Sequence, residues 1–226
     1  MTGPLTLVFA LYPGVTHLDF TGPHQVFTRL PGATVIAASA AGGAIEADGL
    51  TFANLPRLAD IEACDVICVP GGMGTANAMA DPEFMSQLKR LAGGARYITS
   101  VCTGSLILGA AGLLKGRRAA CHWASRDLLA EFGAIADGGR VVRDGNILTG
   151  GGVTAGIDFA LTLAAEIAGS EVAQAIQLTL EYAPQPPFNA GRPETAPAEV
   201  LARVNALFAR TASERLRSAR QAAAVM

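Results

Sequence analysis

The chain has 226 residues, half of them hydrophobic, and a formal net charge of −2 with no block of like charges. This composition supports one sizeable core and excludes the basic surface that binding to nucleic acid or an anionic membrane needs. Its three histidines and four cysteines lack a paired metal-ligand spacing, so no metal site is expected.

In the first hundred residues, short apolar runs alternate with helical patterns. Four runs predict strands of a buried sheet, at residues 5–12, 33–39, 65–69 and 96–101. Residues 45–52 predict a hairpin that turns at Asp48-Gly49. One helix is expected to begin near Gly22-Pro23. Another is expected to begin at Asp81-Pro82-Glu83, where a cap, a first-position proline and a first-turn acid follow one another.

The second half continues the alternation. The expected elements are a helix over 103–114, a strand over 117–123 entering a helix that ends at 132, a hairpin over 139–149, and an amphipathic helix over 154–168. Apolar strands alternating with helices predict an α/β domain with a mostly parallel central sheet, covered on both faces.

The end of the chain has a different composition. Residues 183–197 contain five prolines, which predicts a segment without regular structure. A helix with one apolar stripe is expected after it, to about residue 224. We therefore divide the chain into an α/β domain, 1–182, and a tail, 183–226, that packs on this domain or on a second subunit.

The apolar runs do not predict a targeting or membrane segment. No Lys or Arg precedes the first run, as a secretory signal would need, because the first basic residue is Arg29. Residues 97–114 are uncharged over a length near the lower limit for a membrane span, but their Thr, Ser and Gly content fits a strand, a turn and a helix better. A cytoplasmic protein outside the membrane is expected.

Cys102 is the leading candidate for a nucleophile. It lies between a predicted strand and a predicted helix, which is the strand–turn–helix arrangement of a nucleophile elbow. The amino end of a helix favours a thiolate over a thiol. The alternative is that Cys102 is a small buried apolar residue, which is the interpretation that we adopt for Cys64, Cys68 and Cys121.

Asp19 is the candidate acid. It follows the first strand, and its neighbours Leu18 and Phe20 are apolar, so its carboxyl group is expected to be partly buried. Burial raises the pKa of a carboxyl group and lets it donate a proton near neutral pH. The alternative is a helix cap or a residue that stabilises the loop.

Two glycine-rich turns also follow predicted strands, at 69–75 and 148–156. Consecutive glycines allow backbone N–H groups to converge on one point, as an anion or oxyanion hole requires, although an ordinary turn explains both segments equally well. Thr103 cannot act as a base, and His122 is interpreted as structural. Without a clear Cys-His pair, the residues favour nucleophilic addition to an electrophilic carbon over amide cleavage.

Several segments together resemble the ThiJ/PfpI superfamily, which is related in fold to class I glutamine amidotransferases. They are LDFTGPHQVF, VPGGMGT, TSVCTGSLILGAAGLLKGRRAACHW, LTGGGVTAGIDFALTLAAE and the tail LEYAPQPPFNAGRPETAP. The likeness is greatest to the branch that hydrates isonitriles. It implies a flavodoxin-like three-layer sandwich that works as a homodimer without a cofactor on a small-molecule isonitrile.

The resemblance also implies roles for particular residues. Cys102 matches the nucleophile, Asp19 the acid, and Thr103 the residue after the nucleophile. Peptidase-like relatives carry histidine in place of Thr103, and redox-sensing relatives carry glutamate in place of Asp19. The implied reaction adds water to R–N≡C through a thioimidate on Cys102 and yields an N-substituted formamide. The residues implied to hold the intermediate are Gly71, Gly72, Gly151, Gly152 and Val153.

Two other functions remain open from the sequence. The chain could be a ligand-sensing domain related to AraC-type regulators, or a redox sensor or protein-repair factor in which Cys102 is oxidised. The residues do not identify the natural isonitrile or the group that activates water.

Overall fold

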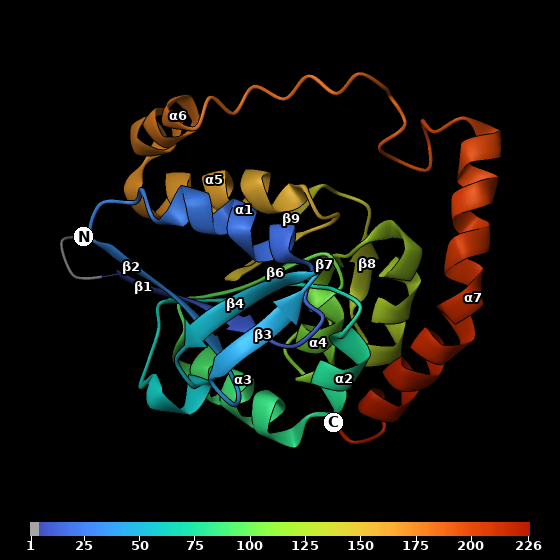
Figure 1. The fold of residues 1–226 in the computed structure, drawn as a ribbon, viewed down its shortest axis with the longest axis horizontal. Helices are drawn as coiled ribbons and strands as arrows, with labels where there is room; N and C mark the ends of the chain where they lie inside the picture. Colours follow the sequence, from blue (N-terminus) through green and yellow to red (C-terminus); the bar gives the residue numbers. More distant parts are fainter. Residues whose placement is uncertain (1–4) are drawn as a thin grey trace.

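A six-stranded sheet forms the centre of the structure, a computed structural model that describes residues 5–226 (Figure 1). In spatial order its strands are β2 (Ala33–Ser39), β1 (Leu5–Leu11), β5 (Val66–Val69), β6 (Tyr97–Val101), β10 (Ile147–Gly150) and β9 (Val141–Asp144). Neighbouring strands are parallel except β10 and β9. After β1 the chain forms β2 on one side and β5 on the other, so a ligand crevice is expected beyond the carboxyl ends of β1 and β5.

Helices cover both faces of this sheet. On one face lie α1 (His17–Phe27) and α5 (Ala155–Ala168), with α6 (Ser170–Thr179) packed on α5. The opposite side carries α2 (Thr75–Ala80), α3 (Pro82–Gly94), α4 (Gly104–Ala110) and the 3-10 helices η1 (Leu58–Asp60) and η2 (Trp123–Phe132). The mostly parallel, flavodoxin-like sandwich expected from the sequence is confirmed.

The two predicted helix starts had different outcomes. Helix α3 begins as expected, because the Asp81 side chain caps it by accepting from the N–H groups of Glu83 at 2.9 Å and Phe84 at 3.1 Å. The predicted start near Gly22-Pro23 was wrong, since α1 already begins at His17 and contains Pro23. The His17 N–H donates to the carboxylate of Asp48, which lies far along the chain.

Both predicted hairpins are present. Strands β3 (Gly43–Ala47) and β4 (Leu50–Leu55) form a separate antiparallel pair whose turn, Asp48-Gly49, has positive φ at both positions. The second hairpin is β9–β10. The predicted helix over 103–114 is shorter than expected, because the chain turns with Gly112 at φ 78° after α4.

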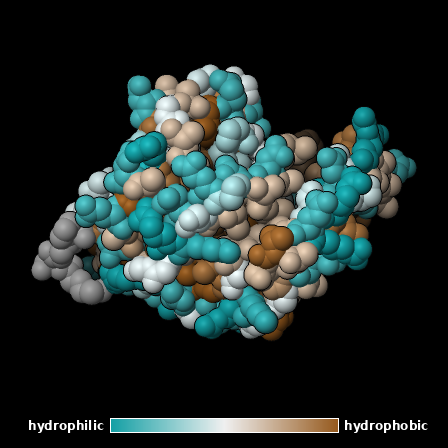
Figure 2. Space-filling view, turned by 90° about the horizontal axis from the view of Figure 1, so that it is seen from below, coloured by the Kyte–Doolittle hydropathy of each residue, from teal (hydrophilic) through white to brown (hydrophobic). Residues whose placement is uncertain are grey.

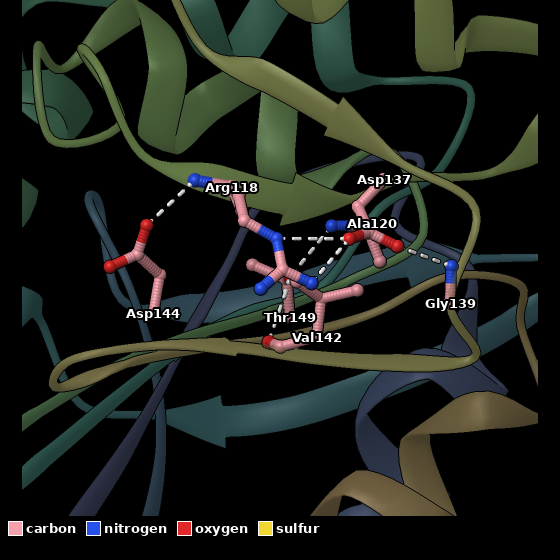
Figure 3. A network of polar contacts seen from close by, with 7 residues as sticks. All are labelled: Arg118, Ala120, Asp137, Gly139, Val142, Asp144 and Thr149. Atoms are coloured by element: carbon pink, nitrogen blue, oxygen red, sulfur yellow. Dashed lines mark hydrogen bonds and ion pairs between the residues drawn. The ribbon is translucent and has the colours of Figure 1, made fainter.

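The strand predicted over 117–123 is short and lies outside the central sheet. It is β7 (Arg118–Ala120), which pairs in parallel with β8 (Ile135–Asp137). Figure 3 shows how this pair is attached: the Ala120 N–H donates to Thr149 Oγ1 at 2.7 Å, and that hydroxyl donates to the Val142 carbonyl at 3.3 Å. These buried bonds bring the end of β7 beside β10.

The C-terminal helix α7 (Ala198–Ala223) projects from the body at the right of Figures 1 and 2. Near its end, Ala219 and Ala222 are buried and Arg220 pairs with Glu131 at 3.3 Å. Leu207 is 60 % exposed. Residues 183–197 contain no helix or strand, as their prolines predict. Across residues 5–226, none of the helices combines the length and apolar character that crossing a bilayer requires.

Candidate active site

Cys102 stands on a strained turn between β6 and α4. Its backbone has φ 58°, which is uncommon for a residue with a side chain, and its N–H donates to the Gly150 carbonyl at 3.0 Å. Gly104 lies against the Val69 carbonyl oxygen so closely that a Cβ there would collide with it. The nucleophile-elbow geometry expected from the sequence is present, and Cys102 is 6 % exposed.

Asp19 lies beside the thiol. It occupies the first turn of α1 and is fully buried, and its carboxyl group is close enough to the Cys102 thiol for each group to shift the pKa of the other. Its Oδ2 accepts from the Gly71 N–H at 2.8 Å, whereas Oδ1 has no hydrogen-bond partner among residues 5–226. Burial raises the pKa of Asp19 to about 7, although the Gly71 N–H and the Cys102 thiol act in the opposite direction.

The thiol and the carboxyl group titrate as a pair. Burial first, and then the charge of Asp19, raise the pKa of Cys102 well above its ordinary value, while the Thr103 N–H lowers it. The helix terminus thus favours the thiolate, as expected, but burial and the Asp19 charge outweigh it. Because burial disfavours two adjacent negative charges, the pair keeps one shared proton above pH 7 and binds a second as the pH falls.

Thr103 and the first glycine turn form one unit. The Gly72 N–H donates to Thr103 Oγ1 at 3.0 Å, and the Gly71 N–H is already bonded to Asp19. The Thr16 N–H donates in turn to the Gly71 carbonyl at 2.9 Å, which fixes the turn against the loop after β1. The two amides expected to form an open anion hole thus hold the side chains of Asp19 and Thr103 instead.

The close approach at Gly71 makes a testable prediction. A Cβ on Gly71 would collide with the backbone nitrogen of Thr103 and would lie 2.6 Å from Thr103 Oγ1 and 3.0 Å from Asp19 Oδ2, so Gly71→Ala should displace the turn at Thr103 together with both side chains. We expect at least about a tenfold loss of kcat/KM, because misplacement by 1 Å can cost about 10²-fold. The matched control is Gly93→Ala in α3, where a Cβ meets nothing within 4 Å. Equal kcat/KM in the two variants would contradict the positioning role of Gly71.

The second glycine turn, at residues 148–156, has backbone N–H groups that remain free to bind a ligand. The Gly151 N–H donates to the Arg140 carbonyl at 2.9 Å, whereas the amides of Gly152 and Val153 have no hydrogen-bond partner within residues 5–226. A Cβ added at Gly152 would meet nothing within 4 Å. Of the residues predicted to hold an intermediate, Gly152 and Val153 are the ones with donors still available.

Tyr12 and Thr75 belong to the site but were missed from the sequence. The buried Tyr12 hydroxyl donates to the Pro70 carbonyl at 2.8 Å and lies 3.2 Å from Thr75 Oγ1. Thr75 Oγ1 is 2.7 Å from Thr103 Oγ1. A tyrosine at the end of an apolar strand resembles a core residue in sequence. The only signal that Tyr12 belongs to the site was the place of its hydroxyl group, at the carboxyl end of the first strand.

The remaining candidates have structural surroundings. His122 Nδ1 accepts from the Ala124 N–H at 3.3 Å and its ring packs against Trp123 and Phe208, so it caps η2. Burial raises the pKa of Cys64 to about 11 and of Cys68 and Cys121 to about 12, and all three are buried as predicted. In the part of the chain that the structure describes, no three His, Cys, Asp or Glu side chains gather as metal ligands.

Comparisons with known proteins agree with this fold. The DJ-1/PfpI family model matches residues 6–166, and the chain belongs to the DJ-1/PfpI family. It is 51 % identical over 198 residues to isonitrile hydratase of Pseudomonas putida, covering 87 % of each chain. The chain is also 28 % identical over 171 residues to protein dj-1beta of Drosophila melanogaster, and this match covers 74 % of this chain and 91 % of that one.

A solved structure gives the same result. The ThiJ/PfpI family protein from Pseudomonas syringae superposes with a TM-score of 0.92 at 43 % identity, covering 98 % of this chain and 91 % of that one. The resemblance to isonitrile hydratase and to the ThiJ/PfpI superfamily, which the motifs predicted, is confirmed.

Proposed function

We propose that this protein is a cofactor-independent isonitrile hydratase. The observation that carries the proposal is the buried pair formed by the Cys102 thiol on its strained turn and the nearby Asp19 carboxyl group, whose pKa is raised to about 7. Half of the residues are identical to those of the Pseudomonas putida isonitrile hydratase over 87 % of the chain, which supports the same activity. The substrate is a small isonitrile.

The first step forms a thioimidate. Sγ of Cys102 bonds to the terminal carbon of R–N≡C, while the thiol proton passes to Asp19 and from there to the same carbon. An S–H bond is replaced by an S–C and a C–H bond, and the product is R–N=CH–S–Cys102. Because Asp19 accepts the proton and returns it, no free charge accumulates in the buried site.

The second step releases the product. The oxygen of a water molecule bonds to the thioimidate carbon, and one water proton passes through Asp19 to the nitrogen. The C–S bond then breaks, sulfur regains the hydroxyl proton as the C=O bond forms, and R–NH–CHO leaves. Asp19 Oδ1 is positioned for this transfer because no group within residues 5–226 engages it.

Backbone donors and Thr103 orient the reacting atoms. The amides of Gly152 and Val153 supply N–H groups to the intermediate, and Gly71 and Gly72 act through the side chains that they hold. The α/β domain, residues 1–182, contains this whole set.

The proposed assembly is a homodimer, supported by the exposed Leu207 on the projecting helix α7. Light scattering should give about twice the chain mass of 23.1 kDa, and a single-chain mass would contradict the dimer.

The activity is tested with an aryl isonitrile, following formamide by chromatography under steady-state conditions. We expect many turnovers per chain without added reductant, metal or cofactor. A redox sensor would show no sustained turnover. Folded protein that forms no formamide from any of several aryl and alkyl isonitriles would overturn the proposed function.

A further inference from the structure

Three hydroxyl groups lie close together beside Cys102. Tyr12 follows β1, Thr75 begins α2 and Thr103 precedes α4, so three distant segments meet at this point. Tyr12 is 3 % and Thr75 is 6 % exposed, which leaves their hydroxyl groups dependent on protein partners. Neither residue takes part in the two reaction steps above.

The direction of these hydrogen bonds follows from the number of protons. The Tyr12 hydroxyl donates its proton to the Pro70 carbonyl at 2.8 Å, and the Thr75 hydroxyl donates to the Gly72 carbonyl at 2.7 Å. Each hydroxyl has one proton. The 2.7 Å contact between Thr75 Oγ1 and Thr103 Oγ1 therefore requires Thr103 to be the donor.

This assignment determines what Thr103 can offer to a ligand. Its proton goes to Thr75, and one of its lone pairs accepts from the Gly72 N–H at 3.0 Å. One lone pair remains, so Thr103 Oγ1 presents an acceptor and no donor to the space beside Cys102. Without Thr75 the hydroxyl proton could turn towards that space.

We propose that Thr75 is a positioning residue that holds the Thr103 hydroxyl as a hydrogen-bond acceptor for the water that attacks the thioimidate. This inference rests on the proposed hydratase function. An attacking water molecule must donate one hydrogen bond while its oxygen approaches carbon, and Thr103 Oγ1 accepts that bond as Asp19 takes the other proton. The isonitrile itself has no proton to donate, so the first step does not need this acceptor.

The two steps should therefore respond differently to Thr75→Val. Loss of one neutral hydrogen bond slows the second step about tenfold. We expect kcat and KM to fall together by about that factor, with kcat/KM nearly unchanged, because kcat/KM reports the first step. After acid quench during turnover, intact-mass spectrometry should find a larger fraction of the protein carrying one isonitrile mass on Cys102. Thr75→Ser, which keeps the hydroxyl, should restore wild-type kcat.

The control is Thr99→Val, which removes a buried hydroxyl of the same size in β6 that donates to the Ile67 carbonyl at 3.0 Å. It should keep wild-type kcat and KM. If Thr75→Val does not fold, Thr75→Ala removes the same hydroxyl without its bulk and should lower kcat and KM together in the same way. Equal falls in kcat and kcat/KM, no extra thioimidate, or no rescue by serine would overturn the positioning role. A wild-type protein without turnover would instead overturn the proposed function.

Discussion

Cys102→Ala is expected to abolish formamide production, with a loss of at least about 10³-fold in kcat. Without sulfur, no thioimidate forms, and water must attack an isonitrile carbon without covalent activation. The substitution removes one small buried atom, so the fold should persist. The measurement is the steady-state formamide assay, with circular dichroism and thermal melting to confirm folding.

The matched control is Cys121→Ala. This cysteine is equally buried and lies close enough to influence the Cys102 thiol, but it has no carboxyl partner. We expect it to keep near-wild-type kcat/KM. Formamide production that survives in Cys102→Ala would remove the nucleophile assignment, and the same loss in both variants would mean that packing at this edge, not the thiol chemistry, controls the rate.

Asp19→Asn is expected to lower kcat/KM by about 10²–10⁴-fold, the usual worth of a general acid–base group. Asparagine has nearly the same shape, and its oxygen can still accept from the Gly71 N–H, so positioning is largely kept. It cannot shuttle the proton from sulfur to carbon. If Asp19 only supported the loop, this isosteric change would leave the rate almost intact.

The pH profile gives a second measurement on the same pair. The active state holds one shared proton, and burial raises the pKa of Asp19 to about 7. Wild-type kcat/KM should therefore rise with pH through about 7 and then level off, because the pKa of Cys102 is raised well above its ordinary value. Asp19→Asn should lack the inflection near 7. A wild-type inflection that persists in the variant would assign it to another group.

Linkage also predicts the effect of Asp19 on stability. Its pKa in the folded state is about 7, above the ordinary 3.8, so the folded protein binds the proton more tightly than the unfolded chain. The stability from this group is complete below pH 4 and is lost as the pH rises through 7. At pH 8 the Asp19→Asn variant should therefore have a higher melting temperature than the wild type. This result would also show that the low activity of the variant is not caused by unfolding.

Local signals in the sequence were sufficient for much of the fold. The four strands predicted in the first hundred residues are all present in the central sheet, since buried parallel strands need continuous apolar runs that are visible in one stretch of chain. The start of α3 was also correct, because the Asp81 cap lies within three residues of the N–H groups that it satisfies. The elbow at Cys102 could also be predicted from local sequence, because the strand, the cysteine and the helix of small residues follow one another directly in the chain.

Contacts between distant segments decided the rest. Helix α1 begins five residues earlier than predicted and contains Pro23, and its first N–H donates to Asp48 of the distant β3–β4 hairpin. The hydrogen bonds by which the Gly71 and Gly72 amides hold Asp19 and Thr103 were also missed from the sequence. They join residues that are 52 and 31 positions apart, and contacts of this kind leave no pattern in a single sequence. The sequence by itself determined the sheet, the elbow and the acid-nucleophile candidates. The tertiary structure alone decided how the thiol and carboxyl share a proton and how Thr75 orients Thr103, because burial and hydrogen-bond direction exist only once the strands are side by side.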